Sequence, residues 1–240
     1  MYTDDRCIAI CDSGIGGLSV LRKCEEKWKG ENFVYFADYE NMPYGNKSDE
    51  TLVEIAFENV KKLLAFSPKL IIFACNTLST VTLNKLPKVG VPIVGVFPKI
   101  ENEGKGALLC TVRTAQSDYV KLLKQKNPNL VILPQETLAS KIENSYCNGE
   151  SFNLNDCLLS LNGDYDFISL GCTHYSIISH LIKNFAPSSR LISGENEIFE
   201  KKVFQNSTFA HQKNEAKIAF VGRGNERIKM VYDFLKIHKN

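Results

Sequence analysis

The chain has 240 residues, 44% of them hydrophobic and 23% charged, which is typical of a globular protein of one or two domains. Its 29 basic and 27 acidic residues leave a net charge of +2, so the charge balance gives no sign of a nucleic-acid partner or of a membrane surface. No apolar stretch approaches the roughly 20 residues that span a bilayer, and the first residues lack the basic region of a signal peptide. We therefore expect a cytoplasmic protein whose eight cysteines are free thiols.

Short apolar segments alternate with helical patterns from the start of the chain. In the first hundred residues, strands are predicted at 6–12, 32–38, 69–75 and 91–97. A glycine turn after the first strand leads into a helix, and further helices are predicted over 49–66 and 76–86. The segment 39–48 is predicted to be a loop because it contains Pro43 and Gly45.

A second series of buried strands follows. They are predicted at 106–112, 129–134, 165–172, 189–194 and 216–222, with helical segments between them and a final helix over 225–239. Strands that alternate with helices in this way predict the α/β class, with mainly parallel sheets flanked by helices. We expect two lobes, one formed by 1–97 plus 207–240 and the other by 98–206, with a cleft between them at the carboxyl ends of the strands.

The glycine turn at residues 12–19, DSGIGGLS, partly matches a dinucleotide-binding fingerprint. Ser19 occupies the third glycine position, and the Asp12 carboxylate would repel a pyrophosphate at the same place. The start of this helix could instead face a smaller anion, such as a carboxylate. A third possibility is a tight turn that needs glycine only for its backbone conformation.

Two cysteines lie at the ends of predicted strands, in the segments FACNT and LGCTH. Neither Cys75 nor Cys172 is followed by the arginine of a phosphatase loop or belongs to a C-x-x-C pair. Each is expected at the start of a helix, where the pKa of a thiol is lowered. His174 and Asp12 are placed to relay or accept a proton. The ordinary alternative is that both cysteines are small core residues.

Two thiols that face each other across a cleft would suit the inversion of a carbon stereocentre. One thiolate removes a proton from one face of the carbon, and the opposite thiol donates a proton to the other face. Cysteine can serve in both roles because its ordinary pKa, about 8.5, lies near neutral pH. The duplicated placement of Cys75 and Cys172 therefore favours a catalytic role for both.

Five segments in order, CDSGIGGLSVL, MPYGNKS, ACNTLST, VPIVGV and LGCTHY, resemble the signature segments of the glutamate racemase family. The similarity extends to FVGRGN at residues 220–225 and so covers nearly the whole chain. The resemblance implies two pseudo-symmetric α/β lobes and interconversion of L- and D-glutamate without a metal or other cofactor. It also implies a homodimer that supplies D-glutamate for peptidoglycan, with no expected contact to nucleic acid or membrane.

The resemblance also assigns roles to residues. Cys75 and Cys172 would be the two acid/base thiols, assisted by Asp12 and His174. The residues that would bind the amino and carboxylate groups of the substrate are Ser13, Tyr44, Gly45, Asn76, Thr77, Thr114 and Thr173.

This chain departs from the family pattern at four places, which are Asn41, Phe97, Ser176 and Asn225. None of them removes a thiol or a group that assists one. Two alternatives stay open at this point. The first is a racemase of aspartate or of another acidic amino acid, because one methylene changes binding in a pocket by only about 1–3 kcal/mol. The second is a catalytically weak binding or regulatory protein that has kept the fold.

Overall fold

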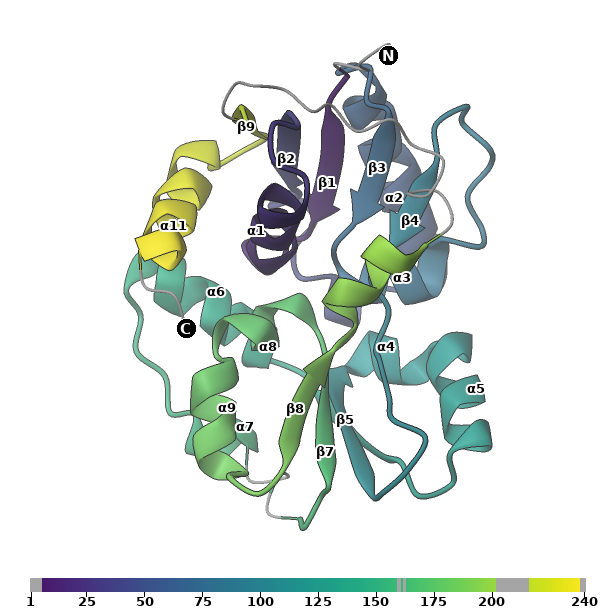
Figure 1. The fold of residues 1–240 in the computed structure, drawn as a ribbon, viewed down its shortest axis with the longest axis vertical. Coiled ribbons are helices and arrows are strands. Elements are labelled where there is room, and N and C mark those ends of the chain that lie inside the picture. The colour runs from purple at the N-terminus through teal and green to yellow at the C-terminus, as the bar shows by residue number, and fades with distance from the viewer. Residues whose placement is uncertain (1–5, 159–160, 162, 202–215, 238–240) are drawn as a thin grey trace.

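The computed structural model describes residues 6–158, 161, 163–201 and 216–237. Two parallel β-sheets, each flanked by helices, form two lobes that are stacked along the long axis of the molecule (Figure 1). The α/β class expected from the alternation of strands and helices is confirmed. Among the described residues, no helix combines the length and the apolar character needed to cross a membrane.

The first sheet has five strands in the order β4-β3-β1-β2-β9, and all the neighbouring strands are parallel. Its strands are β1 (Ile8–Asp12), β2 (Phe33–Ala37), β3 (Leu70–Phe73), β4 (Ile93–Gly95) and β9 (Ile218–Val221). The helices of this lobe are α1 (Leu18–Lys27), η1 (Tyr44–Asn46), α2 (Asp49–Leu64), α3 (Asn76–Thr82) and α11 (Asn225–Ile237).

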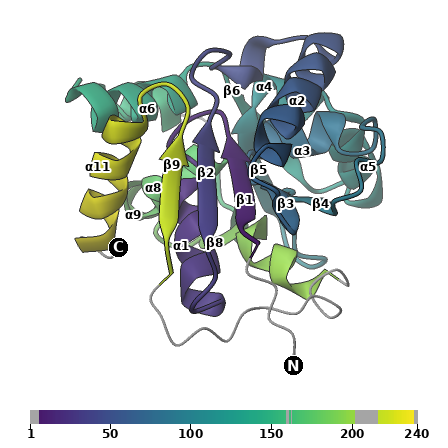
Figure 2. The ribbon, with the colours of Figure 1, turned by 90° about the horizontal axis from the view of Figure 1, so that it is seen from above.

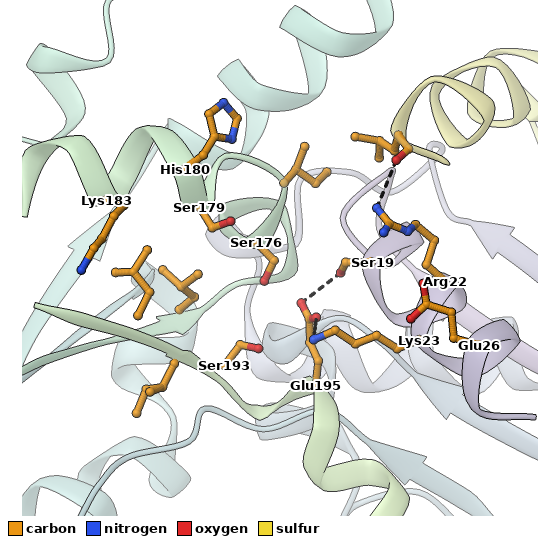
Figure 3. A pocket seen from close by; sticks show the side chains of 15 residues that line it. Ser19, Arg22, Lys23, Glu26, Ser176, Ser179, His180, Lys183, Ser193 and Glu195 are labelled. Carbon is orange, nitrogen blue, oxygen red and sulfur yellow. Dashed lines mark hydrogen bonds and ion pairs between the residues drawn. The ribbon is translucent and has the colours of Figure 1, made fainter. Parts of the chain in front are cut away.

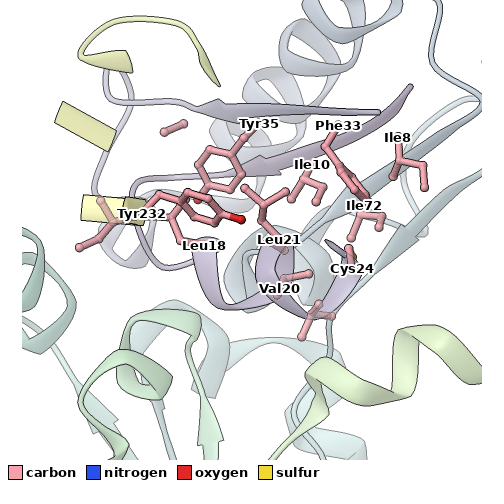
Figure 4. Packing of buried hydrophobic residues seen from close by; sticks show 14 of the residues in the cluster. Ile8, Ile10, Leu18, Val20, Leu21, Cys24, Phe33, Tyr35, Ile72 and Tyr232 are labelled. Carbon is pink, nitrogen blue, oxygen red and sulfur yellow. The ribbon is translucent and has the colours of Figure 1, made fainter. Parts of the chain in front are cut away.

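Both faces of the first sheet are buried, as expected for a parallel sheet covered by helices. Successive side chains of a strand point to opposite faces, so Ile8 and Ile10 pack with α1 and α11, whereas Ala9 and Cys11 pack with α2 and α3. Figure 4 shows the first of these clusters, where Tyr232 of α11 closes over the strands. Figure 2 shows α2 and α3 on the opposite side of the sheet from α1.

The second sheet has four parallel strands in the order β6-β5-β7-β8. These strands are β5 (Gly106–Thr111), β6 (Val131–Gln135), β7 (Phe167–Gly171) and β8 (Arg190–Ser193). The helices of this lobe are α4 (Val112–Gln116), α5 (Asp118–Lys126), α6 (Leu138–Asn148), α7 (Asn155–Leu158), α8 (Thr173–Ile177) and α9 (Ser179–Phe185). The segment η3 (Gly194–Glu200) follows β8 and packs against the first lobe, where Ile198 joins the cluster of Ile8 and Ile10.

The observed elements are mostly a little shorter than predicted. The helix expected over 76–86 ends at Thr82, because the β-branched run of residues 80–82 and the approach to Pro87 both disfavour a longer helix. Cys147 and Cys157 lie in α6 and α7. All eight cysteines are free thiols.

The chain passes from the first sheet to the second between β4 and β5, and it leaves the second sheet again after β8. These two crossings touch. A Cβ on Gly194 would lie 1.8 Å from the carbonyl oxygen of Phe97, and Lys99 Nζ pairs with Glu197 Oε1 at 3.2 Å. The predicted lobe boundary at 97/98 falls in the first crossing, and the boundary at 206/207 lies outside the described residues.

Candidate active site

The two strand-end cysteines begin helices in different lobes. Cys75 follows β3 and is the N-cap residue of α3, and Cys172 follows β7 and is the N-cap residue of α8. Each side chain is only 6% exposed. The two thiols are close enough that charge on Cys172 contributes to raising the pKa of Cys75. The carboxyl ends of the two sheets therefore bring both cysteines to one buried region.

The expectation that a helix start lowers the thiol pKa is wrong for Cys75. Burial raises the pKa of this thiol most, and the negative charge of Asp12 raises it further. Hydrogen bonds from the backbone N–H groups of Leu78 and Thr77 lower it, but by less. Cys75 therefore holds its proton at neutral pH.

Asp12 joins the two lobes at the end of β1. Its Oδ1 accepts a hydrogen bond from the Gly14 amide at 3.0 Å, and its Oδ2 accepts one from Thr173 Oγ1 in the second lobe at 3.1 Å. Burial raises the pKa of Asp12, while the charge of His174 opposes this shift. The carboxylate thus lies between the Cys75 thiol and the residues that follow Cys172.

His174 connects Cys172 to a buried carboxylate that the sequence analysis missed. Its Nδ1 lies 3.9 Å from Cys172 Sγ, and its Nε2 lies 2.6 Å from Glu143 Oε2. Burial lowers the pKa of His174, but interactions with Cys172 and Glu143 outweigh it and raise the pKa well above its ordinary value. A protonated imidazole in this position can donate one N–H to Glu143 and direct the other toward the sulfur.

Glu143 lies on α6 and also binds the first lobe. Its Oε2 accepts a hydrogen bond from the Ile15 amide at 3.0 Å, and its Oε1 accepts one from the Tyr39 hydroxyl. Burial raises the pKa of this carboxyl, but hydrogen bonds from His174, Tyr39 and Ile15 leave it below its usual value. Glu143 is therefore a buried carboxylate that holds His174 against the glycine turn.

The glycine turn is explained by this contact. The Ile15 amide lies in the turn before α1 and donates to the Glu143 carboxylate, so a carboxylate of the second lobe binds the backbone of the turn. A Cβ on Gly14 would lie 2.2 Å from Glu143 Oε2, and a Cβ on Gly16 would lie 2.5 Å from His174 Nδ1. Glycine is needed because the second lobe approaches the backbone of the turn so closely.

We expect Gly14→Ala to lower the free energy of unfolding by about 1–3 kcal/mol, because the added methyl group overlaps the Glu143 carboxylate. Urea unfolding monitored by circular dichroism measures the change. The same substitution in a Glu143→Ala background should cost much less, since the overlapping atoms are gone. Equal losses in the two backgrounds would contradict this explanation of the turn.

Three threonine hydroxyls form a second contact between the lobes. Thr77 Oγ1 lies 2.9 Å from Thr111 Oγ1 and 3.0 Å from Thr114 Oγ1, and Thr111 donates to Thr114 at 3.0 Å. Thr77 belongs to the first lobe, whereas Thr111 and Thr114 lie at the end of β5 and in α4. Thr111 was not predicted, although it is the last residue of a buried strand.

Four further residues predicted to bind the substrate, Ser13, Tyr44, Gly45 and Asn76, lie near the thiols, Asp12 or the threonine cluster and contact different partners. Ser13 is buried beside Asp12, and Asn76 donates to the carbonyl oxygen of Val96 at 3.3 Å. A Cβ on Gly45 would lie 3.1 Å from Thr111 Cβ, so this loop packs against the threonine cluster. Tyr44 is buried, but its hydroxyl binds Asp38 at 2.7 Å.

A cavity of about 610 Å³ opens elsewhere, between α1 of the first lobe and α8, α9 and β8 of the second (Figure 3). None of the predicted substrate or catalytic residues lines it. Glu195 on its wall accepts a hydrogen bond from Ser19 at 2.9 Å and pairs with Lys23 at 2.7 Å. Ser176, one of the departures from the family pattern, also lines this cavity.

Within the described residues, no group of three or more histidine, cysteine, aspartate or glutamate side chains is arranged to hold a metal ion. The titratable groups of the site form two sets, one beside each of the two thiols. Asp12 lies beside Cys75, and His174 with Glu143 lies beside Cys172. The arrangement can accept a proton at one thiol and donate a proton from the other.

Two α/β lobes that bring a pair of cysteines to one buried site place the chain among the amino-acid racemases, which are isomerases. The chain is 31% identical to the glutamate racemase of Clostridium kluyveri, in a match that covers 98% of this chain and 100% of the relative. The chain belongs to the glutamate racemase family.

Other comparisons agree. The glutamate racemase of Clostridium acetobutylicum is 31% identical, in a match that covers 81% of each chain. The glutamate racemase of Escherichia coli, solved with L-glutamate and the activator UDP-MurNAc-Ala, superposes with a TM-score of 0.79 at 26% identity, covering 95% of each chain. The glutamate racemase of Campylobacter jejuni shares the fold, with a TM-score of 0.81 at 23% identity over 97% of this chain and 99% of that one. No protein-family model matches the chain.

Proposed function

We propose that this chain interconverts L- and D-glutamate by proton transfer between Cys75 and Cys172. The observation that carries the proposal is that the two thiols come from different lobes and each has its own ionisable partner. Asp12 is beside Cys75, and His174 is 3.9 Å from Cys172. Relatives named glutamate racemase at 31% identity support glutamate as the substrate, and the Escherichia coli relative has been solved with L-glutamate bound.

In each direction one thiolate removes the α-hydrogen as a proton, and the electron pair left on Cα is delocalised into the α-carboxylate. The opposite thiol then donates its proton to the other face of Cα, so the stereocentre inverts and the charge passes from one sulfur to the other. Both proton transfers are made by the thiols of the chain. The proposed reaction therefore needs no cofactor for these steps.

The two thiols start from different electrostatic conditions. Asp12 raises the pKa of Cys75, but the ammonium group of a bound amino acid would offset this negative charge and make the thiolate more accessible. On the opposite side, a protonated His174 would stabilise negative charge on Cys172. Ser13, Asn76, Thr77, Thr114 and Thr173 are proposed to hold the amino and carboxylate groups between the two sulfurs.

The proposed biological role is to supply D-glutamate for peptidoglycan in the cytoplasm, with the enzyme acting as a homodimer. The family membership of the chain supports this role. The near-neutral charge balance gives no reason to expect a nucleic-acid partner.

Racemisation in D2O tests the proton transfer. Starting from either enantiomer, we expect the product enantiomer to contain one deuterium at Cα, because the donating thiol has exchanged with solvent. Chiral chromatography with mass spectrometry measures it, and aspartate under the same conditions tests the substrate alternative. Product without deuterium would rule out the two-thiol mechanism, and faster turnover of aspartate would overturn glutamate as the substrate.

A further inference from the structure

A second buried polar network lies on the Cys75 side of the site, and none of the residue roles given so far explains it. Asp38 follows β2, Tyr44 begins η1, and Asn59 lies in the middle of α2. The Tyr44 hydroxyl donates to Asp38 Oδ2 at 2.7 Å, and Asn59 Nδ2 donates to Asp38 Oδ2 at 3.0 Å and to the Tyr44 hydroxyl oxygen at 2.9 Å. These three side chains are at most 2% exposed.

The hydroxyl of Tyr44 is fully used within this network. A phenol has one proton to donate, and this proton goes to Asp38. Its oxygen already accepts a hydrogen bond from Asn59. The Tyr44 hydroxyl therefore cannot also donate to a carboxylate of the substrate unless the network breaks.

The network holds a loop that reaches the catalytic region. Negative charge on Cys11, Asp38 and Cys75 raises the pKa of Tyr44 in addition to the effect of burial, so its hydroxyl lies near the Cys75 thiol. The next residue, Gly45, packs against Thr111 of the threonine cluster, where an added Cβ would be 3.1 Å from Thr111 Cβ. The side chain of Tyr44 is thus an anchor, and the backbone at Gly45 is the part of this loop that meets the other lobe.

Asn59 connects Asp38 and Tyr44, and its Nδ2 also lies 3.8 Å from Cys11 Sγ on β1, outside the pair of proposed acid/base thiols. It lies in the apolar stripe of α2, between Ile55 and Leu63, where a polar side chain is costly unless it is hydrogen-bonded. Asp38 has further donors from Asn41, whose Nδ2 lies 3.0 and 2.9 Å from the two carboxylate oxygens. Among the described contacts of the Tyr44 hydroxyl, Asn59 donates a hydrogen bond to its oxygen, and Asp38 accepts the hydrogen bond that the hydroxyl donates.

We propose that Asn59 is a positioning residue of the glutamate site, which acts through Tyr44 to hold the loop of residues 43–46 at the cleft. This inference rests on the proposed function. It assigns Asn59 to substrate binding and not to proton transfer, because Asn59 touches neither thiol of the reacting pair. It also changes the role proposed for Tyr44. Its hydroxyl anchors the loop and does not bind the substrate directly.

The test is steady-state racemisation of L- and D-glutamate by Asn59→Leu, which keeps the side-chain size and removes the amide. We expect KM for both enantiomers to rise about tenfold, the factor expected for losing one hydrogen bond to a polar network with a charged member, while kcat changes by less than about threefold. Tyr44→Phe should raise KM by a similar factor. The double variant should be no worse than the more impaired single variant, because both act through one chain of contacts.

Val60→Ala is the matched control, since Val60 is buried on the same helix and has no part in the network. It should lower stability while KM stays within twofold of the wild-type value. An Asn59→Leu or Tyr44→Phe enzyme with unchanged KM would overturn the inference, as would equal KM increases in Val60→Ala. If Asn59→Leu does not fold, Tyr44→Phe alone decides. A wild-type protein that does not racemise glutamate would instead refute the proposed function.

Discussion

Serine at position 75 or 172 should lower the rate of glutamate racemisation about 10³-fold, the range that a positioned acid or base contributes. Each thiol must both accept and donate a proton during the reversible reaction, and a serine hydroxyl is a far weaker acid than a thiol. Both sulfurs are required, because a single base would return the proton to the face from which it came. The two variants should therefore be similarly impaired in both directions.

Circular dichroism or polarimetric assays of purified Cys75→Ser and Cys172→Ser measure this loss. Cys7→Ser provides the control, because Cys7 precedes β1 at the amino end of the strand, away from Asp12, and its thiol donates to the Phe66 carbonyl oxygen. That variant should retain near-native turnover. If either of the first two variants kept more than about a tenth of the wild-type rate, the thiol concerned would not be an acid/base group in the reaction.

Glu143→Gln should lower the free energy of unfolding by about 3 kcal/mol at pH 7, because it leaves the protonated His174 buried without its counter-ion. The Glu143 carboxyl has a lowered pKa in the folded protein, so its contribution to stability is present above its unfolded pKa of about 4.3. This contribution is lost as the pH falls through the lower, folded pKa. His174 has a raised pKa, so its contribution is present below about 6.5 and is lost only as the pH rises through its folded value.

Urea unfolding between pH 3 and pH 8 tests both parts of this argument. The wild-type protein should lose stability on the acid side more steeply than Glu143→Gln, which has no carboxyl to titrate at this position. Glu150→Gln, an exposed substitution close to the end of the same helix, should behave as the wild type. Parallel pH profiles for wild type and Glu143→Gln would show that the ion pair does not stabilise the fold.

We also expect Glu143→Gln to slow racemisation, since His174 loses the contact that orients it toward Cys172.

The α/β class and the positions of Cys75 and Cys172 could be predicted because they depend on local patterns. A buried strand followed by a polar segment and a helix can be recognised along the chain, and parallel strands bring such ends to one edge of a sheet. Asp12 could be predicted for the same reason, since it ends the first strand. What these residues share is a position directly after an apolar run.

Glu143 and Asn59 could not be predicted in this way, because they lie within helices and act on residues that are distant in sequence. A signal for both was nevertheless present. Glu143 lies in the stripe formed by Ala139, Ile142 and Tyr146, and Asn59 replaces an apolar residue in the stripe of α2. A polar residue in an apolar stripe requires a buried partner, but the sequence does not identify that partner.

The pKa of Cys75 was predicted with the wrong sign because only its local environment was considered. The helix start acts in the expected direction through the amides of Thr77 and Leu78, but burial and the Asp12 carboxylate have larger effects. Both of these depend on how deeply the strand end lies between the lobes. Local sequence therefore predicted where Cys75 lies, while the proton affinity of its thiol depends on tertiary structure.

The contact between Gly194 and Phe97 has a consequence for how the substrate enters. We expect the two touching segments that connect the lobes to act as a hinge, so that the lobes open mainly by rotation about one axis. The contacts of Asp12 with Thr173, of Ile15 with Glu143 and of Thr77 with Thr111 all lie between the lobes and must break and reform in the same movement. Access to both sulfurs is then gained and lost together, and either enantiomer enters a site that closes as one unit.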